Sequence, residues 1–258
     1  MPGTERIVLQ PRDREFLKEL SGMRVVDHAQ AKVVAGFGST DRANKRLLKL
    51  TRAGLLRRFF LGSGGGHKAL YALSEKGARC VSVPLRGPRR PHGAVLVADS
   101  FVDHQLAVNA LYCALKFGAL PEGIAFRRWI AFSQPITPDL PLIPDGYVEL
   151  VSPLGVMAAF VEVDLGNESL RVWREKTRKY LQLAISGTYR RLFGGERFRV
   201  LVVANSARRM ESLRKAVSEE TQKIFRFTTL DAAHSDFFGP VWKRPAGDGS
   251  EPLIPPSP

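Results

Sequence analysis

The stretch IPDGYVELVSPLGVMAAFVEVDLGNESLRVWREKTRKY, residues 143–180, decides the fold that we expect for the C-terminal half of the chain. It contains two apolar runs that are rich in β-forming residues, Tyr147–Val151 and Gly155–Val163. A Ser-Pro-Leu-Gly turn joins these runs, and a segment with helical spacing of its apolar residues follows. The pattern predicts a β-hairpin followed directly by an amphipathic helix over Ser169–Ile185.

Acidic residues lie near the ends of both predicted strands. Asp145 precedes the first strand, and strand alternation places Glu162 and Asp164 on one face of the second. Lys176 is on the helix that follows. Carboxylate oxygens suit a hard divalent cation such as Mg²⁺, or Mn²⁺ in its place. We therefore predict a metal site with Asp145, Glu162 and Asp164 as ligands, and these three residues and Lys176 are the candidate catalytic residues.

The same acids also have a simpler interpretation. Pro144-Asp145-Gly146 is an ordinary turn sequence, because proline presets φ and glycine tolerates positive φ. The two acids of the second strand would be costly to bury unpaired. They could instead form ion pairs with basic residues of the following helix, namely Arg171, Arg174 or Lys176. The sequence leaves both interpretations open.

Composition excludes several classes of protein. Of the 258 residues, 44% are hydrophobic, which is enough for a buried core. Cys80 and Cys113 are the only cysteines, so we expect neither a disulfide framework nor a cysteine-based zinc site. No apolar run approaches the roughly 20 residues of a membrane span, and the first residues lack signal-peptide character. We therefore expect a cytoplasmic protein without a membrane partner.

The net charge of +14 at pH 7 indicates a polyanionic partner. Residues 1–98 contain 19 Lys and Arg against 7 Asp and Glu, whereas residues 99–258 contain 20 against 18. The positive excess therefore lies almost entirely in the N-terminal part of the chain. Such a concentrated basic region favours nucleic acid as the partner more strongly than diffuse basicity would.

The basic N-terminal part has the pattern of a small domain of helices and one hairpin. We predict three helices, the third being Arg42–Ala53, and then two short strands around the glycine-rich tip Gly62–Gly66. On the third helix Ala43, Leu47 and Leu50 share one narrow arc, and the cationic residues lie away from it. The candidate DNA contacts are basic residues of this helix and of the hairpin, namely Arg42, Lys45, Arg46, Lys49, Arg52, Arg57, Arg58 and Lys68.

We expect four segments along the chain. The basic domain, residues 1–83, is followed by a linker rich in Pro and Arg, residues 84–98. The second domain, residues 99–238, has the predicted order α-β-β-β-α-β-α-β, which gives a mixed sheet flanked by helices. Residues 239–258 are rich in Pro, Gly and Ser, and we expect them to be disordered. The predicted fold class is therefore α/β, or more strictly α+β.

The N-terminal pattern resembles winged helix-turn-helix domains across residues 10–81, including the segment Arg46–Leu56, which reads RLLKLTRAGLL. The resemblance implies that the third helix enters the major groove of duplex DNA. It also implies that the tip Gly62–Gly66 lies over phosphates or the minor groove. Winged helices serve as protein-docking modules as well, so this alternative stays open.

The C-terminal hairpin and helix resemble the restriction-endonuclease-like fold of PD-(D/E)xK nucleases. In that family an Asp opens the first core strand, and Glu-x-Lys lies on the second. The acids hold one or two metal ions, and the Lys helps to activate or orient the attacking water. By resemblance Asp145 matches the first acid and Glu162 the second. The lysine position holds Asp164, which is a departure from the family's pattern. Lys176, or in second place Lys179, could replace the lysine from the helix.

Taken together, the two halves resemble the replication-relaxation family of bacterial plasmids and mobile elements. The motifs are Pro144-Asp145-Gly146, EVDLGNE at residues 162–168 and KTRKY at residues 176–180. The resemblance implies a DNA-binding protein of plasmid or mobile-element replication or mobilisation, with replication or mobilisation proteins or a second copy as partners. Two interpretations follow. The C-terminal domain is a Mg²⁺-dependent endonuclease or nickase, or it is the degenerate nuclease fold of a non-catalytic regulator or replication accessory.

Overall fold

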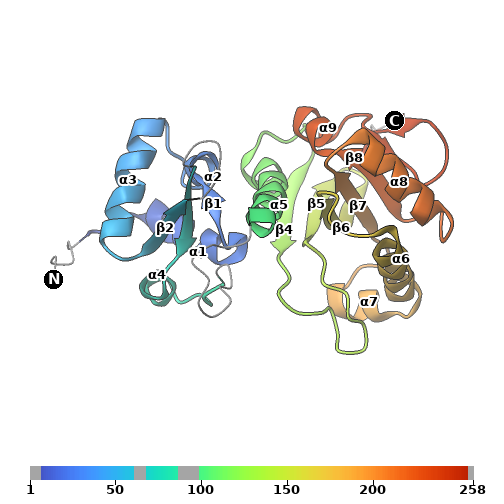
Figure 1. Ribbon diagram of the computed structural model, residues 1–258, viewed down its shortest axis with the longest axis horizontal. Coiled ribbons are helices and arrows are strands. Elements are labelled where there is room, and N and C mark those ends of the chain that lie inside the picture. Colours follow the sequence, from blue (N-terminus) through green and yellow to red (C-terminus); the bar gives the residue numbers. More distant parts are fainter. Residues whose placement is uncertain (1–6, 61–67, 87–98, 255–258) are drawn as a thin grey trace. The chain divides into compact units, whose positions relative to one another are not determined.

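A computed structural model of the protein describes residues 7–60, 68–86 and 99–254 (Figure 1). The chain divides into two compact units, residues 1–113 and 114–258. The glycine-rich tip and most of the predicted linker lie outside the described residues. Among the helices in the described ranges, none is both long enough and apolar enough to span a bilayer.

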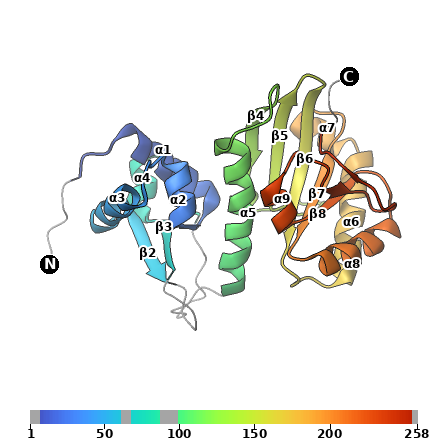
Figure 2. The ribbon, with the colours of Figure 1, turned by 90° about the horizontal axis from the view of Figure 1, so that it is seen from above.

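The N-terminal unit has the predicted order of helices and hairpin, with one short strand in addition. Its elements are α1 (Pro11–Met23), β1 (Val26–Asp27), α2 (His28–Val34), α3 (Thr40–Arg52), β2 (Leu56–Phe60), β3 (Ala69–Leu73) and α4 (Glu75–Cys80). Asp27, Ser39 and Ser74 cap α2, α3 and α4, because each side chain accepts a hydrogen bond from a backbone N–H of the first turn. Strands β2 and β3 pair antiparallel (Figure 2). Strand β1 pairs with the other edge of β3.

A buried ion pair joins α1 to α3. Asp13 is 1% exposed, and both of its carboxylate oxygens accept hydrogen bonds from Arg46. The side chain of Arg46 is 14% exposed and also donates to the carbonyl oxygen of Val8. Removing one partner of such a pair leaves the other charge buried and uncompensated. Because Asp13 holds the guanidinium of Arg46, this ion pair argues against the predicted DNA contact of Arg46.

Helix α5 (Asp99–Phe117) packs largely within the N-terminal unit. Asn109 donates to the backbone carbonyl oxygens of Met23 and Val25, and Val102 and Leu106 are buried against Val25. We expected the whole helix to belong to the second domain, residues 99–238. The division between the units falls inside the helix instead. The sequence did not indicate that α5 packs on the N-terminal unit. A buried asparagine that donates to distant carbonyl groups cannot be distinguished in the sequence from an asparagine on the surface.

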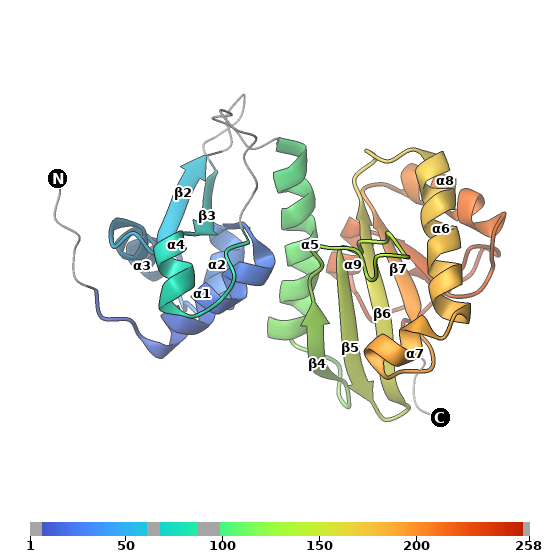
Figure 3. The ribbon, with the colours of Figure 1, turned by 90° about the horizontal axis from the view of Figure 1, so that it is seen from below.

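The C-terminal unit is built on a mixed sheet. Its strands are β4 (Ala125–Ile130), β5 (Gly146–Ser152), β6 (Gly155–Asp164), β7 (Arg199–Ala204), β8 (Phe225–Thr229), β9 (Trp242–Lys243) and β10 (Ser250–Glu251). Its helices after α5 are α6 (Leu170–Ile185), α7 (Thr188–Phe193), α8 (Ala207–Ser218) and α9 (Leu230–Ser235). The strand order is β10-β9-β8-β7-β6-β5-β4, and Figure 3 shows β4 to β7 side by side. Strands β4, β5 and β6 are antiparallel neighbours, and β6, β7 and β8 are parallel. The predicted fold class, a mixed sheet flanked by helices, is confirmed.

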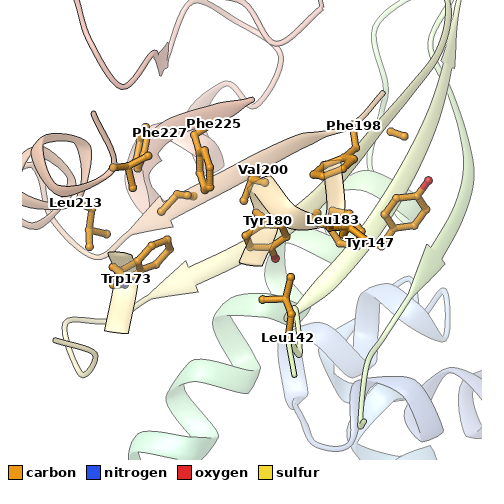
Figure 4. Packing of buried hydrophobic residues seen from close by; sticks show 14 of the residues in the cluster. Leu142, Tyr147, Trp173, Tyr180, Leu183, Phe198, Val200, Leu213, Phe225 and Phe227 are labelled. Carbon is orange, nitrogen blue, oxygen red and sulfur yellow. The ribbon is translucent and has the colours of Figure 1, made fainter. Parts of the chain in front are cut away.

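Helices α6, α7 and α8 share one apolar core with one face of the sheet. The ring of Phe160 on β6 lies 5.0 Å from that of Tyr147, 5.5 Å from that of Tyr180 and 5.0 Å from that of Phe198, measured between ring centroids. Trp173 of α6 lies in the same core (Figure 4). Because side chains alternate along a strand, the face of β6 that carries Phe160 also carries the two acids that follow it.

The chain after residue 239 is ordered as far as residue 254, which corrects the prediction of a disordered tail. Trp242 is fully buried and donates to the carbonyl oxygen of Phe237. Leu253 is buried as well, and Arg214 of α8 donates to the carbonyl oxygen of Arg244. Two large apolar residues, Trp242 and Leu253, hold this segment against the rest of the unit. The high content of Pro, Gly and Ser around them led to the prediction of disorder.

Candidate functional site

The C-terminal end of β6 carries two buried carboxylates. Glu162 is 1% exposed and Asp164 is 3% exposed. Both lie on the face that α6 covers, as the alternation predicted. A buried carboxylate is costly unless hydrogen-bond donors or opposite charges surround it. The two acids have different donors, and the difference decides what each of them can do.

Protein donors occupy both oxygens of Asp164. Arg209, in the first turn of α8, donates from Nε to Oδ1 at 2.7 Å and from Nη2 to Oδ2 at 2.9 Å. Trp173 Nε1 donates to Oδ2 at 2.6 Å, and the backbone N–H of Gly166 donates to Oδ1 at 2.8 Å. Burial by itself raises the pKa of Asp164, but these hydrogen bonds hold it below its ordinary value. A metal ion would have to displace a bidentate arginine, which argues against the predicted role of Asp164 as a metal ligand.

Glu162 is bonded by two residues of α6. Lys176 Nζ donates to Oε2 at 3.0 Å, and the hydroxyl of Tyr180 donates to Oε1 at 2.5 Å. These two residues are four apart and therefore lie on the same face of the helix. Burial, together with the smaller effect of the charge of Asp145, raises the pKa of Glu162 to about 7, although Lys176 and Tyr180 act in the opposite direction. Unlike Asp164, Glu162 therefore binds a proton at nearly neutral pH.

Lys176 is a fixed positive charge in this site. Its Nζ also lies 2.9 and 3.1 Å from the two carboxylate oxygens of Glu168 and 4.8 Å from the centroid of the Trp173 ring. Burial by itself lowers the pKa of Lys176, but the carboxylates of Glu162 and Glu168 raise it above its ordinary value. Lys176 therefore stays protonated and is suited to stabilising negative charge, and not to removing a proton from water.

Asp145 is held beside Glu162 by backbone geometry. Its Oδ2 accepts a hydrogen bond from the backbone N–H of Val163 at 2.8 Å. The next residue, Gly146, is the first residue of β5, and a Cβ there would lie 2.2 Å from Cζ2 of Trp129. Gly146 does not have positive φ. Glycine is therefore required here for space, and the turn interpretation of this motif gives the wrong reason for it.

Two carboxylates remain for a cation, and not the three that we predicted. Within residues 7–60, 68–86 and 99–254, no three His, Cys, Asp or Glu side chains form a group that could hold a metal ion. Mg²⁺ is often held by one or two carboxylates together with waters and substrate phosphates. Asp145 and Glu162 fit Mg²⁺ or Mn²⁺ in that manner, and a cation there would favour the charged form of Glu162.

In the N-terminal unit, most of the predicted DNA contacts are exposed. Apart from Arg46, the predicted residues of α3 and β2 are exposed, namely Arg42, Lys45, Lys49, Arg52, Arg57 and Arg58. Lys45 pairs with Asp41 at the surface. Lys68 is 55% exposed, and its Nζ lies 2.7 Å from Oδ2 of Asp27. The Lys45 pair is exposed on both sides and therefore weak, so it does not prevent Lys45 from binding an anion, whereas Lys68 is held by an aspartate that is 11% exposed.

A model of the replication-relaxation family matches residues 17–195, which is more than half of the chain. The chain belongs to the replication-relaxation family. A comparison with curated proteins gave no match. Among solved structures, the restriction endonuclease FokI is similar over 87% of this chain and 43% of that chain, at 10% sequence identity and a TM-score of 0.31. The chain thus spans less than half the length of that protein, and a TM-score this low supports no further conclusion.

The region that matches the replication-relaxation family contains the site residues on β6 and α6, but it ends before Arg209. Sequence reasoning missed Arg209 as the partner of Asp164. The contact arises because β6 and β7 are parallel with Asp164 opposite Ala204, and α8 begins soon afterwards, which the sequence alone does not show. It also missed Glu149, which is buried on β5 and accepts hydrogen bonds from Arg128 and Tyr147.

The raised pKa of Glu162 predicts a specific dependence of stability on pH. The folded protein keeps the Glu162 proton to about pH 7, whereas the unfolded chain releases it near its ordinary value of 4.5. This contribution to stability is complete below the unfolded pKa and is lost as the pH rises through the folded pKa. In Glu162→Gln, which does not ionise, the stability relative to wild type should therefore increase between pH 4.5 and 7, by about 3 kcal/mol.

Chemical denaturation of both proteins across that range measures the difference. The lowered pKa of Asp164 acts at lower pH than this window, so it does not interfere. Parallel pH profiles for wild type and Glu162→Gln would contradict the assignment of the titrating group.

Proposed function

We propose that this chain is a DNA-binding protein of plasmid or mobile-element replication or mobilisation, and that its N-terminal unit binds duplex DNA. Family membership supports the replication context. The observation that carries the DNA-binding proposal is the surface of α3, where four cations are exposed while Ala43, Leu47 and Leu50 on the other side are fully buried. A cytoplasmic location, replication or mobilisation proteins as partners, and a homodimer belong to the same proposal.

In this proposal α3 lies in the major groove, and its cations neutralise phosphates. These residues are Arg42, Lys45, Lys49 and Arg52. Arg57 and Arg58 on β2 extend the cationic surface, and the guanidinium of Arg58 lies 4.8 Å from the ring centroid of Phe60. Binding through phosphates releases counterions and is therefore steeply dependent on salt. A winged helix that docks on protein would not show that dependence.

A double substitution on α3 tests this proposal. Lys49→Ala with Arg52→Ala should weaken duplex binding at every sequence, and should lower the slope of log K against log salt by about 1 for each phosphate that is no longer neutralised. Fluorescence anisotropy over a salt series measures both quantities. A matched double variant of exposed cations in the C-terminal unit, Arg171→Ala with Lys215→Ala, should leave the slope unchanged. Equal slopes for wild type and the α3 variant would contradict the assigned surface.

A second candidate function is metal-dependent cleavage of a phosphodiester by the C-terminal unit. The observation that favours it is the cluster of Asp145, Glu162 and Lys176, in which two carboxylates lie together and Glu162 is buried beside the ammonium group of Lys176. When bound, Mg²⁺ would polarise a phosphoryl oxygen and lower the pKa of a water. Asp145 and Glu162 would hold the ion, Tyr180 would orient Glu162, and protonated Lys176 would stabilise negative charge on the phosphate.

The rival to cleavage is a nuclease-like scaffold without catalytic activity. Two observations favour it. Asp164 stands where PD-(D/E)xK nucleases have lysine, and Arg209 holds its carboxylate. The ammonium group of Lys176 is already paired with Glu162 and Glu168. In this alternative the C-terminal unit serves as a surface for partner proteins or for dimerisation.

Incubation with supercoiled plasmid distinguishes these alternatives. If the unit cleaves DNA, wild type with Mg²⁺ or Mn²⁺ should nick or linearise the plasmid, chelator should abolish the activity, and Glu162→Gln should lower it by at least ~100-fold, as for loss of an essential group. Glu175→Gln, an exposed change on the same helix, is the matched control and should keep full activity. If the plasmid stays supercoiled while wild type and Glu162→Gln bind it equally, cleavage is contradicted and the role of a non-catalytic scaffold is supported.

A further inference from the structure

A groove of about 830 Å³ lies at the other end of the sheet from Glu162. Strands β6, β7 and β8 are parallel. The groove is lined by residues at the start of each of these strands, whereas Glu162 lies near the end of β6. Apolar lining residues come from several elements, among them Val156, Met157, Phe198, Ile224 and Leu253. The cations that line the groove are Arg197, Arg199, Lys223, Arg226 and Arg244. Among the described residues, Glu196 is the single acidic residue in its lining.

Neighbouring strands bring two of these arginines together. Arg199 begins β7, and Arg226 lies on β8 opposite Leu201. Val200 and Phe225 point into the core that α6 and α8 cover, so alternation places Arg199 and Arg226 on the other face of the sheet. Both side chains are partly buried, and Arg199 donates to the carbonyl oxygen of Leu253 in the ordered C-terminal segment.

One carboxylate, Glu251, pairs with two of the three neighbouring arginines. Glu251 accepts hydrogen bonds from Nε and Nη2 of Arg244, the shortest at 2.8 Å, and its Oε1 lies 2.5 Å from Nε of Arg226. The charges of Arg226, Arg244 and Glu251 all act on Arg199. The cluster of Arg199, Arg226, Arg244 and Glu251 therefore carries a formal excess of two positive charges.

The pKa values follow this imbalance. Hydrogen bonding to Glu251 raises the pKa of Arg244. In contrast, burial and the charge of neighbouring arginines lower the pKa of Arg199 and of Arg226, despite the opposite effect of Glu251. Glu251 pairs with both Arg226 and Arg244, whereas Arg199 forms no ion pair with a carboxylate of the described residues. An anion in the groove would supply the negative charge that a single carboxylate does not provide.

We propose that this groove binds a small phosphate monoester that carries an apolar or planar group, the chemical class of the nucleoside monophosphates. Guanidinium groups match phosphate oxygens through paired N–H donors. The apolar lining provides a surface for the attached group, and the volume lies in the range of roughly 300–1,000 Å³ that small-molecule sites occupy. The groove lies at the start of β6, β7 and β8, away from Glu162 near the end of β6, and the proposal does not rest on the proposed DNA-binding and cleavage functions.

Calorimetric titration of the full chain with AMP tests the proposal. Wild type should bind AMP at least 10-fold more tightly than adenosine and inorganic phosphate. Arg199→Met, which keeps an apolar stem, should weaken AMP binding at least 10-fold. Arg208→Met is the matched control, because Arg208 is exposed in the first turn of α8 and does not line the groove, and its affinity should equal that of wild type.

A second variant keeps the test decisive if Arg199→Met folds poorly. Glu251→Gln removes the competing carboxylate and should tighten AMP binding several-fold, whereas a groove without an anion site would show no gain. Three results would overturn the proposal: no AMP binding by wild type, equal affinity for AMP and inorganic phosphate, or unchanged affinity in both variants. Tighter binding of a single-stranded oligonucleotide than of AMP, lost in Arg199→Met, would replace the small ligand with a nucleic-acid strand.

Discussion

Two carboxylates buried two residues apart on one strand are the constraint on which the C-terminal unit depends. Glu162 and Asp164 lie on the face of β6 that packs in the core, where an unpaired charge would be costly. Lys176 and Tyr180 of α6 donate hydrogen bonds to Glu162. Trp173 of α6 and Arg209 of α8 donate hydrogen bonds to Asp164. The two helices are thus fixed against the sheet by polar contacts as well as by the aromatic core around Phe160.

The hydrogen-bond donors also give the two carboxylates different roles, because Asp164 is held in the fold while Glu162 can exchange a proton or bind a ligand. Asp164 is held by a bidentate arginine and stays ionised, whereas Glu162 holds a proton to about pH 7 and has Asp145 beside it. The same principle operates in the N-terminal unit. Arg46 is bound to the buried Asp13, while its neighbours on α3 remain at the surface. In both units one member of a charged group stabilises the fold, and the others are left for a ligand.

Local patterns predicted much of this fold because they depend on nearby residues. Alternation placed Glu162 and Asp164 on one face of β6, and helical spacing placed Ala43, Leu47 and Leu50 on the one arc of α3 that the structure buries. Partners that are distant in the sequence were not predictable in the same way. A helical projection gives the direction of Arg46 but does not reveal the carboxylate on α1 that binds it. Arg209 becomes a partner of Asp164 only through the parallel pairing of β6 with β7.

The central claim is that Asp145 and Glu162, without Asp164, form the place where a divalent cation binds. Anomalous diffraction from crystals soaked in Mn²⁺ tests it most directly. We expect one anomalous peak that is coordinated by carboxylate oxygens of Asp145 and Glu162, with Asp164 still bonded to Arg209. A peak coordinated by Asp164, with Arg209 displaced, would contradict it, and so would the absence of any peak at these carboxylates.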